Sequence, residues 1–295
     1  MSCGQIALNK LDFKIDNYYA SEINGYSIKV VQENYPDTIQ LGNVTDISKK
    51  YLDKLPNIDL LMGGSPCQNL SKAVINRKKY NQGLKGKKSK LFYEYVRILD
   101  LIKKQNSKVK FLLENVESMS NKDKKIITET LGVKPIMINS SLVSAQDRKR
   151  LYWTNIEVKS TPKDKGLVLK DIMQPKEEID RLHNNSRMNF WYDKQFKFNG
   201  YDKRVIAELD LGNYDTMNRV YNPKFKAPTL TTARGGHRQK KVFQAGKCRK
   251  LTPIEYERLQ TVPEGYTDCV SNTRRYNMLG DGWTVDVIKH ILSFI

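Results

Sequence analysis

Short apolar segments alternate with helix-like segments through the first 150 residues of this 295-residue chain. Strand-like stretches lie near residues 18–22, 38–41, 58–62, 110–113, 135–138 and 151–154. Helix-like stretches lie between them, over residues 25–34, 91–104 and 122–131. This alternation predicts an α/β fold with a mainly parallel sheet covered by helices.

Three polar strings lie beside the predicted strands. Gly63-Gly64-Ser65-Pro66-Cys67 follows the strand at 58–62, Glu114-Asn115 follows the next one, and Gln146-Asp147-Arg148-Lys149-Arg150 precedes the last. The carboxyl ends of parallel strands share one edge of a sheet, where ligands bind, so we expect Cys67 and Glu114 to meet there. Arg148 and Arg150 are two residues apart in a strand-like segment and are expected to face the same way.

The charge of the chain favours a polyanionic partner. The formal net charge is +19, and Lys and Arg that face phosphates release condensed counterions on binding. Nucleic acid is therefore the first candidate partner. A lysine-rich surface that only aids solubility is the alternative interpretation.

Composition also bounds the class of protein. The sequence is 39% hydrophobic, which is enough for a packed core. It has no apolar run of about 18 residues and no signal-peptide pattern, so we expect a cytoplasmic protein. Four widely spaced cysteines and three histidines predict neither a disulfide framework nor a metal site.

The middle of the chain has a different texture. Residues 157–247 contain scattered aromatics and turn residues without a clear period. Helical signals return at Thr252-Pro253, with proline at the first helical position, and at an amphipathic segment over 283–294. We therefore expect residues 1–156 and 248–295 to form one domain, with residues 157–247 inserted as a second, smaller one.

With these strings in this order, the sequence resembles the cytosine-5 DNA methyltransferases over nearly its whole length. Residues 249–260 resemble the ninth motif of that family, and residues 279–285 the tenth. The Trp283 form of the tenth motif and the string Tyr19-Ala20-Ser21-Glu22 are most similar to the eukaryotic de novo branch and its phage and bacterial relatives. The resemblance implies a Rossmann-like methyltransferase fold, an inserted target-recognition domain, double-stranded DNA as partner and no metal.

The resemblance also implies catalytic roles. Cys67 would add to carbon 6 of cytosine, which turns the ring into an enamine that can attack a methyl group. Glu114 would handle the proton at N3, supported by Asn115, and Arg148 and Arg150 would clamp the base and its sugar-phosphate. The cytosine must first leave the base stack.

The implied methyl donor is S-adenosylmethionine. Glu22 ends a predicted strand, close to the spacing of about 20 residues after a glycine, here Gly4, that is expected for an acid on a ribose. Asn43 stands where the family has an aspartate near the adenine. A structural role for Glu22 and core packing for Trp283 remain open. The other candidate cofactor residues are Cys3, Gly4, Ile23, Val44, Pro66, Leu91, Asp281, Gly282 and Trp283.

Two segments are candidates for DNA contact. The lysine-rich segment 72–90 is expected to be a mobile loop that closes over DNA, and Thr229 to Gly236 resembles a target-recognition stretch. Arg234 and Arg238 could read guanine edges or bind phosphate. The full set of candidate DNA-binding residues is Gln68, Ser71, Lys72, Arg77, Gln146, Thr231, Arg234 and Arg238.

The amino end departs from the family pattern. Met1 to Gly4 lie within the turn that follows the family's first strand, so that strand is expected to be missing, with its neighbours unpaired and the donor pocket incomplete. A misassigned start or a trimmed form of an active enzyme, and an inactive DNA-binding regulator, are both open explanations. Methylation of transfer RNA is a third interpretation, although the Cys-Phe-Thr string usual in those relatives is absent. Protection of phage or host DNA is a hypothesis for the biological role.

Overall fold

The computed structural model describes residues 1–66, 70, 83–86, 90–185, 189–192, 196–198, 202–212, 214–233 and 237–295. Several predicted site residues lie outside the described residues: Cys67, Gln68, Ser71, Lys72, Arg77 and Arg234. The predicted DNA-closing loop also lies outside them, except for residues 83–86 and 90.

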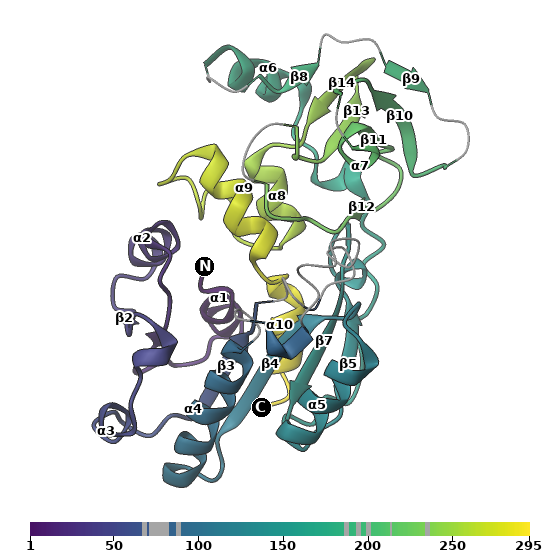
Figure 1. Ribbon diagram of the computed structural model, residues 1–295. Helices are drawn as coiled ribbons and strands as arrows, with labels where there is room; N and C mark the ends of the chain where they lie inside the picture. Colours follow the sequence, from purple (N-terminus) through teal and green to yellow (C-terminus); the bar gives the residue numbers. More distant parts are fainter. Residues whose placement is uncertain are drawn as a thin grey trace.

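A mixed four-stranded sheet forms the centre of the first part of the molecule (Figure 1). In spatial order its strands are β3 (Leu60–Gly64), β4 (Lys110–Val116), β7 (Lys149–Thr154) and β5 (Ile136–Asn139). β3 and β4 are parallel, as predicted, whereas β7 is antiparallel to both of its neighbours. The connection from β5 to β7 is too short for the crossover helix that a parallel pair requires, which explains the difference from the predicted sheet.

The helices at 25–34, 91–105 and 121–131 match the predicted helix-like stretches, whereas the short helix at 49–52 was not predicted. They are α2 (Gly25–Asn34), α3 (Lys49–Leu52), α4 (Leu91–Gln105) and α5 (Asn121–Leu131), preceded by α1 (Cys3–Asn9). α2 starts after Asn24, whose Oδ1 accepts hydrogen bonds from the backbone N–H groups of Tyr26 and Ser27. α1 was not predicted, because its residues resemble a turn of the family. Short 3-10 helices cover Val44–Asp46, Gly83–Lys85, Ser140–Leu142 and Leu169–Ile172.

The sheet is interrupted between β1 and β3. β1 (Tyr19–Ala20) and β2 (Ile39–Gln40) form a separate parallel pair, and no described residue pairs with the second edge of β1 or of β3. β3 is apolar yet only half-buried along most of its length, whereas β4 is almost fully buried. The interruption expected from the family resemblance is therefore observed.

A second sheet of six strands occupies residues 191–250. In spatial order it contains β8 (Trp191–Tyr192), β14 (Lys247–Lys250), β13 (Lys241–Gln244), β11 (Arg219–Tyr221), β10 (Val205–Leu209) and β9 (Phe196–Phe198). All neighbours are antiparallel except β11 and β13. Strands this short carry no clear period, so the sequence showed only an irregular region. The sheet ends at Lys250, past the boundary expected at residue 247.

Smaller elements connect the two sheets. α6 (Lys176–Asn185) and α7 (Asp215–Asn218) flank the six-stranded sheet, and β12 (Ala227–Pro228) pairs with β6 (Gln146–Asp147) just before β7. The chain then continues through α8 (Pro253–Leu259), α9 (Asn272–Asp281) and α10 (Val285–Leu292). In Figure 1, α8 and α9 lie between the two sheets.

The predicted start of α8 is confirmed. Thr252 Oγ1 accepts a hydrogen bond from the Glu255 N–H, and Glu255 Oε2 accepts one from the Thr252 N–H at 2.7 Å. These reciprocal bonds satisfy two donors that a helix start would otherwise leave unpaired. Glu255 also forms a fully buried ion pair with Arg249, at 2.6 Å.

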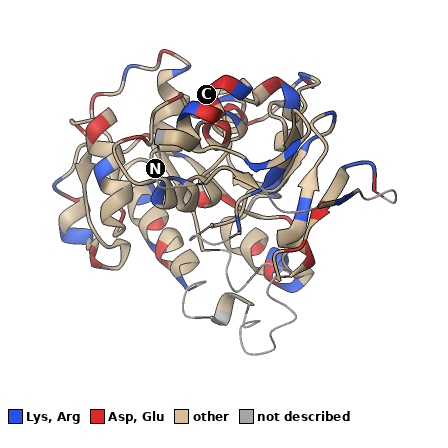
Figure 2. Cartoon of the chain, turned by 90° about the horizontal axis from the view of Figure 1, so that it is seen from above, with Lys and Arg blue, Asp and Glu red and all other residues tan. Residues whose placement is uncertain are grey.

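Among the described residues, Lys and Arg are interspersed with Asp and Glu in the view from above (Figure 2). Within the described part of the chain, no helix is both long and apolar enough to span a membrane.

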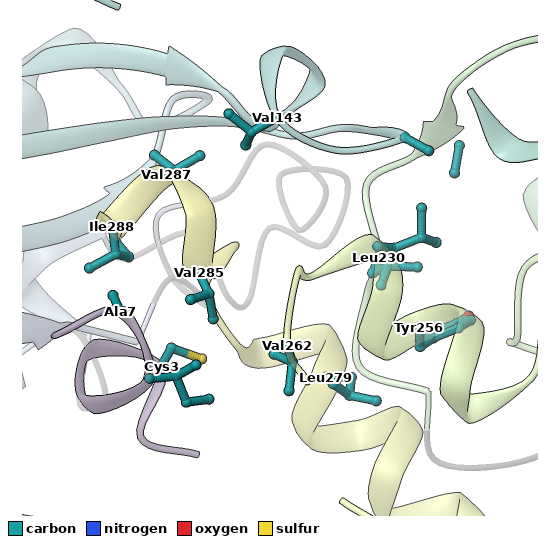
Figure 3. Packing of buried hydrophobic residues seen from close by; sticks show 14 of the residues in the cluster. Cys3, Ala7, Val143, Leu230, Tyr256, Val262, Leu279, Val285, Val287 and Ile288 are labelled. Carbon is teal, nitrogen blue, oxygen red and sulfur yellow. The ribbon is translucent and has the colours of Figure 1, made fainter. Parts of the chain in front are cut away.

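One hydrophobic cluster joins the two ends of the chain. Figure 3 shows Cys3 and Ala7 of α1 beside Ile288 of α10, and the same cluster extends through Leu279 of α9 to Leu230. The carboxyl-terminal helix thus packs against the first helix.

Candidate active site

A cleft of about 1580 Å³ lies between the two sheets. One wall is formed by the β1 and β3 regions and the other by residues 226–232. Twelve predicted site residues line it: Glu22, Ile23, Asn43, Val44, Pro66, Leu91, Glu114, Arg148, Arg150, Thr231, Asp281 and Trp283. The described residues Cys3, Gly4, Gln146, Arg238 and Gly282 were also predicted and are not among those that line it.

Glu114 and Arg150 form an ion pair at the edge of the sheet. Glu114 lies in β4 opposite Tyr152 of β7, and this register brings Arg150 of the same strand within reach. Arg150 Nε lies 2.9 Å from Glu114 Oε1, and the two side chains are only 13% and 11% exposed. Charge-assisted hydrogen bonds of this kind are strong when partly shielded from water. The pair places a carboxylate and a guanidinium together at the cleft.

Asn115 braces the segment that leads to Cys67. Its side chain is fully buried, and Nδ2 donates to Ser65 Oγ at 2.8 Å and to the Ser65 carbonyl at 3.3 Å. Its Oδ1 accepts a bond from the Val116 N–H. The amide was expected to support Glu114, and in the structure it holds the end of β3 instead.

Gly64 permits a close approach of three segments. A Cβ on this residue would lie 3.1 Å from Trp283 Nε1 and 3.3 Å from Glu114 Oε2. Both distances are shorter than ordinary van der Waals contact with carbon. The absence of a side chain at Gly64 therefore lets the indole and the carboxylate approach the end of β3.

Arg148 is a buried brace. Its guanidinium is 4% exposed and donates to the carbonyls of Leu230 at 3.1 Å and Gly282 at 3.0 Å. Arg148 and Arg150 both line the cleft, but they contact different groups. The bonds of Arg148 join the recognition stretch to the tenth-motif segment and favour a supporting role over the clamp expected from the resemblance.

Gln146 is also placed in the interior. It is fully buried, its Nε2 donates to the Leu259 carbonyl and Gln260 Oε1, and its Oε1 accepts from the Leu230 N–H at 2.8 Å. Both Nε2 and Oε1 of Gln146 are thus hydrogen-bonded within the protein. This placement supports a bracing role for Gln146 at the start of the stretch 229–236, and its direct DNA contact stays a prediction.

The expected donor site lies at the ends of β1 and β2. Glu22 Oε1 accepts hydrogen bonds from the N–H groups of Ile23 and Asn24, and Asn43 Oδ1 accepts one from the Thr45 N–H at 3.2 Å. These bonds orient a carboxylate and an amide oxygen along the cleft wall. Such oxygens can accept hydrogen bonds from ribose hydroxyls and from an amino group. The residues present therefore fit S-adenosylmethionine.

Cys3 and Gly4 are placed differently from the other donor-site candidates. Both are buried in the first turn of α1, and a Cβ on Gly4 would lie 2.9 Å from Met62 Sδ. The glycine thus allows α1 to pack against β3. Neither residue lines the cleft, and their contact with the methyl donor stays a prediction.

Two arginines that line the cleft were missed in the sequence. Arg204 and Arg219 line the cleft from the six-stranded sheet, where Arg219 starts β11. The short strands beside these residues have no clear hydrophobic period, so the sequence did not indicate that the two side chains face the cleft. The described residues contain no group of three or more His, Cys, Asp or Glu that could bind a metal.

Comparison with known proteins finds methyltransferases among the relatives of this chain. The chain is 28% identical to the type II methyltransferase M1.ScrFI of Lactococcus lactis subsp. cremoris over 291 residues, which cover 94% of this chain and 71% of the relative. It is 24% identical to the type II methyltransferase M.HhaI of Haemophilus parahaemolyticus, with 92% and 85% covered.

Solved structures share the fold. A DNA modification methyltransferase encoded in an Escherichia coli prophage matches with a TM-score of 0.65 and 17% identity, over 98% of this chain and 94% of the other. The Dnmt2 methyltransferase of S. pombe matches with a TM-score of 0.69 and 15% identity, over 99% and 94%. Residues 2–295 match the family model described as C-5 cytosine-specific DNA methylase, and the chain therefore belongs to that family.

Proposed function

We propose that this chain transfers a methyl group from S-adenosylmethionine to carbon 5 of a flipped cytosine in double-stranded DNA, through a covalent bond to Cys67. The observation that carries the proposal is the Glu114–Arg150 pair, held at the cleft beside the end of β3. Two residues after Ser65 the same segment reaches Cys67. The proposal thus brings a nucleophile and a carboxyl to one base.

The chemistry of the described cysteines supports Cys67 as the nucleophile. Burial raises the pKa of Cys3, raises the pKa of Cys248 to about 11, and, with Glu33 nearby, raises the pKa of Cys269. A thiol with a raised pKa offers little thiolate at neutral pH, and the thiolate is the reactive form. None of these three cysteines lines the cleft.

Cytosine must become electron-rich at carbon 5 before that carbon can attack a methyl group. The Cys67 thiolate would form a bond to carbon 6, and Glu114 would share the proton at N3 as negative charge enters the ring. S-adenosylmethionine, when bound, supplies the electrophilic methyl group that carbon 5 attacks. Loss of the carbon 5 proton to a base then allows the thiolate to leave and restores the aromatic ring.

Other residues would position the reactants. Asn115 holds Ser65 and thereby the approach to Cys67, and Arg150 holds the Glu114 carboxylate. Glu22 and Asn43 would bind the donor, while Trp283 would pack beside it. We also propose that residues 157–247 form a target-recognition domain, in which Arg204 and Arg219 face the cleft and contact DNA. We also propose that the protein acts in the cytoplasm of a bacterial or phage-infected cell, as supported by its bacterial and phage methyltransferase relatives.

The test is a transfer assay with two substrates. The full chain is incubated with methyl-labelled S-adenosylmethionine and either mixed-sequence duplex DNA or transfer RNA, beside Cys67→Ala and the control Cys269→Ala. We expect label in DNA from the unmodified chain and the control, and none from Cys67→Ala. Label in transfer RNA alone, or DNA binding without transfer, would contradict the proposal.

A further inference from the structure

Lys241 is a buried lysine at the start of β13 in the six-stranded sheet. The residue is 1% exposed. Its Nζ donates to the carbonyl oxygens of Met217 and His237 at 2.6 Å and of Gln239 at 3.0 Å. An ammonium has three protons to donate, and these three carbonyls match that number. All three acceptors are neutral backbone groups rather than carboxylates.

The three carbonyls belong to two separate segments of the inserted sheet region. Met217 lies in α7, which leads directly into Arg219 of β11. His237 and Gln239 flank Arg238, just after the recognition stretch. Arg219 lines the cleft and Arg238 is exposed. One ammonium therefore fixes the backbone beside two cationic side chains that are distant in sequence.

The surroundings of Lys241 oppose its charge. Lys240 and Lys250 are close enough to repel it, and burial together with this repulsion lowers the pKa of Lys241 to about 7. The ring of Tyr192 lies 5.8 Å from Lys241 Nζ, and the Tyr192 hydroxyl shares a 3.2 Å hydrogen bond with His237 Nδ1. A lowered pKa means that burial disfavours the ammonium more than its contacts favour it. The hydrogen bonds of Lys241 therefore fix two backbone segments at a cost for the charged form.

We propose that Lys241 is a positioning residue for DNA recognition, which holds the Met217 and His237–Gln239 backbones in one arrangement and so sets where Arg219 and Arg238 meet DNA. The inference rests on the proposed DNA-methylating function. It deepens that function, because it assigns part of the target discrimination to a residue that itself touches no DNA. A loosened arrangement would weaken and relax DNA recognition while leaving the chemical step intact.

The test compares substitutions on one hairpin. Lys241→Met keeps the length of the side chain but removes the donors, and Lys241→Gln keeps two of them. Lys247→Met is the matched control, because Lys247 is exposed on the partner strand β14 and its substitution removes the same charge. Each protein methylates mixed-sequence plasmid DNA, and bisulfite sequencing maps the modified sites. The rate at saturating DNA and the KM for DNA are measured in parallel.

We expect Lys241→Met to raise the KM for DNA by about tenfold, which corresponds to the loss of about 1.4 kcal/mol of binding free energy. We also expect it to methylate sites outside the unmodified pattern, with kcat within about twofold of the unmodified chain, because the Glu114 site is untouched. Lys241→Gln should lie between the two, and Lys247→Met should retain the original pattern of sites.

A KM and a site pattern equal to those of Lys247→Met would overturn the proposal. Failure of both Lys241 variants to fold, seen as loss of cooperative thermal unfolding, would also overturn it, because Lys241 would then serve stability. If the unmodified chain transfers no methyl group to DNA, the proposed function itself fails and this inference falls with it. These failures are distinguishable because the unmodified chain is measured first.

Discussion

Asn115 Nδ2 donates a 2.8 Å hydrogen bond to Ser65 Oγ and thereby ties β4 to the end of β3. Glu114 precedes Asn115 in the same strand, and Ser65 is followed by Pro66 and Cys67. Neighbouring residues of β4 thus serve two functions, since Glu114 presents a carboxyl to the cleft and Asn115 holds the segment that leads to Cys67, the proposed nucleophile. Catalysis depends on such fixed geometry, because a small misplacement of a reacting group slows the reaction strongly.

Substitution of Asn115 by Ala should slow methyl transfer without abolishing DNA binding. The change removes the donor to Ser65, and a lost buried hydrogen bond costs about 1–3 kcal/mol. We expect the single-turnover rate to fall by about 10- to 100-fold. DNA affinity, measured by fluorescence anisotropy, and cooperative unfolding serve as controls. An unchanged single-turnover rate would show that the Asn115–Ser65 bond does not position Cys67.

Glu114 and Arg150 should behave as one unit in a double-mutant cycle. Glu114→Gln removes the proton-handling carboxyl, and we expect kcat to fall by about 10²- to 10⁴-fold. If Arg150 acts through the Glu114 carboxylate, adding Arg150→Met to Glu114→Gln should cause little further loss. The measurement is the single-turnover rate of both single variants and the double variant. Losses that multiply would show that Arg150 acts independently of Glu114.

Gly280 should tolerate no side chain, because α9 packs directly on the recognition stretch. A Cβ at this position would lie 2.6 Å from the Thr232 backbone nitrogen. We expect Gly280→Ala to lower the free energy of unfolding by about 1–3 kcal/mol. Gly25→Ala is the control, since a Cβ there meets nothing within 4 Å. Equal urea midpoints for the two variants would contradict the packing described for Gly280.

The buried Lys241 should leave a signature in the pH dependence of stability. The pKa of Lys241 is lowered to about 7, below the value of about 10.4 expected in the unfolded chain. Between these values the unfolded chain binds more protons, so the contribution of Lys241 to the free energy of unfolding rises with pH, by at most about 1.4 kcal/mol per unit.

This prediction is tested by urea unfolding of the unmodified chain and Lys241→Met between about pH 7 and 10, the window set by the two pKa values. The difference in unfolding free energy, unmodified chain minus variant, should rise with pH because the variant lacks the titrating group. Other titrating groups are common to both proteins and cancel in the difference. A difference that stays constant would rule out a lowered pKa at Lys241.

The sequence was most informative where local patterns decide the structure. The helical period over 91–104 predicted α4, and the signals at Thr252-Pro253 predicted the start of α8 with its capping bonds. The strand before Gly63 predicted that β3 would lead into the segment of Cys67. Each of these features depends on neighbours within a few residues, which propensity and capping rules describe.

Features that depend on distant contacts could not be predicted. The spacing of Arg148 and Arg150 predicted a common side, but it could not show that Leu230 and Gly282 would engage one guanidinium and Glu114 the other. The same limit applies to Lys241, whose acceptors lie on two separate segments. Lysine in a short strand normally indicates an exposed position, and tertiary contacts override that preference here.

The most direct test of the account is covalent trapping at Cys67. Duplex DNA that contains 5-fluorocytosine is incubated with the full chain and S-adenosylmethionine, and the adduct is digested and mapped by mass spectrometry. Fluorine blocks the loss of the carbon 5 substituent, so a covalent route must stop with DNA attached to the protein. The account predicts an adduct on Cys67 that requires the methyl donor and is absent from Cys67→Ala. Methyl transfer to normal DNA by a preparation that forms no such adduct, or an adduct on another residue, would contradict it.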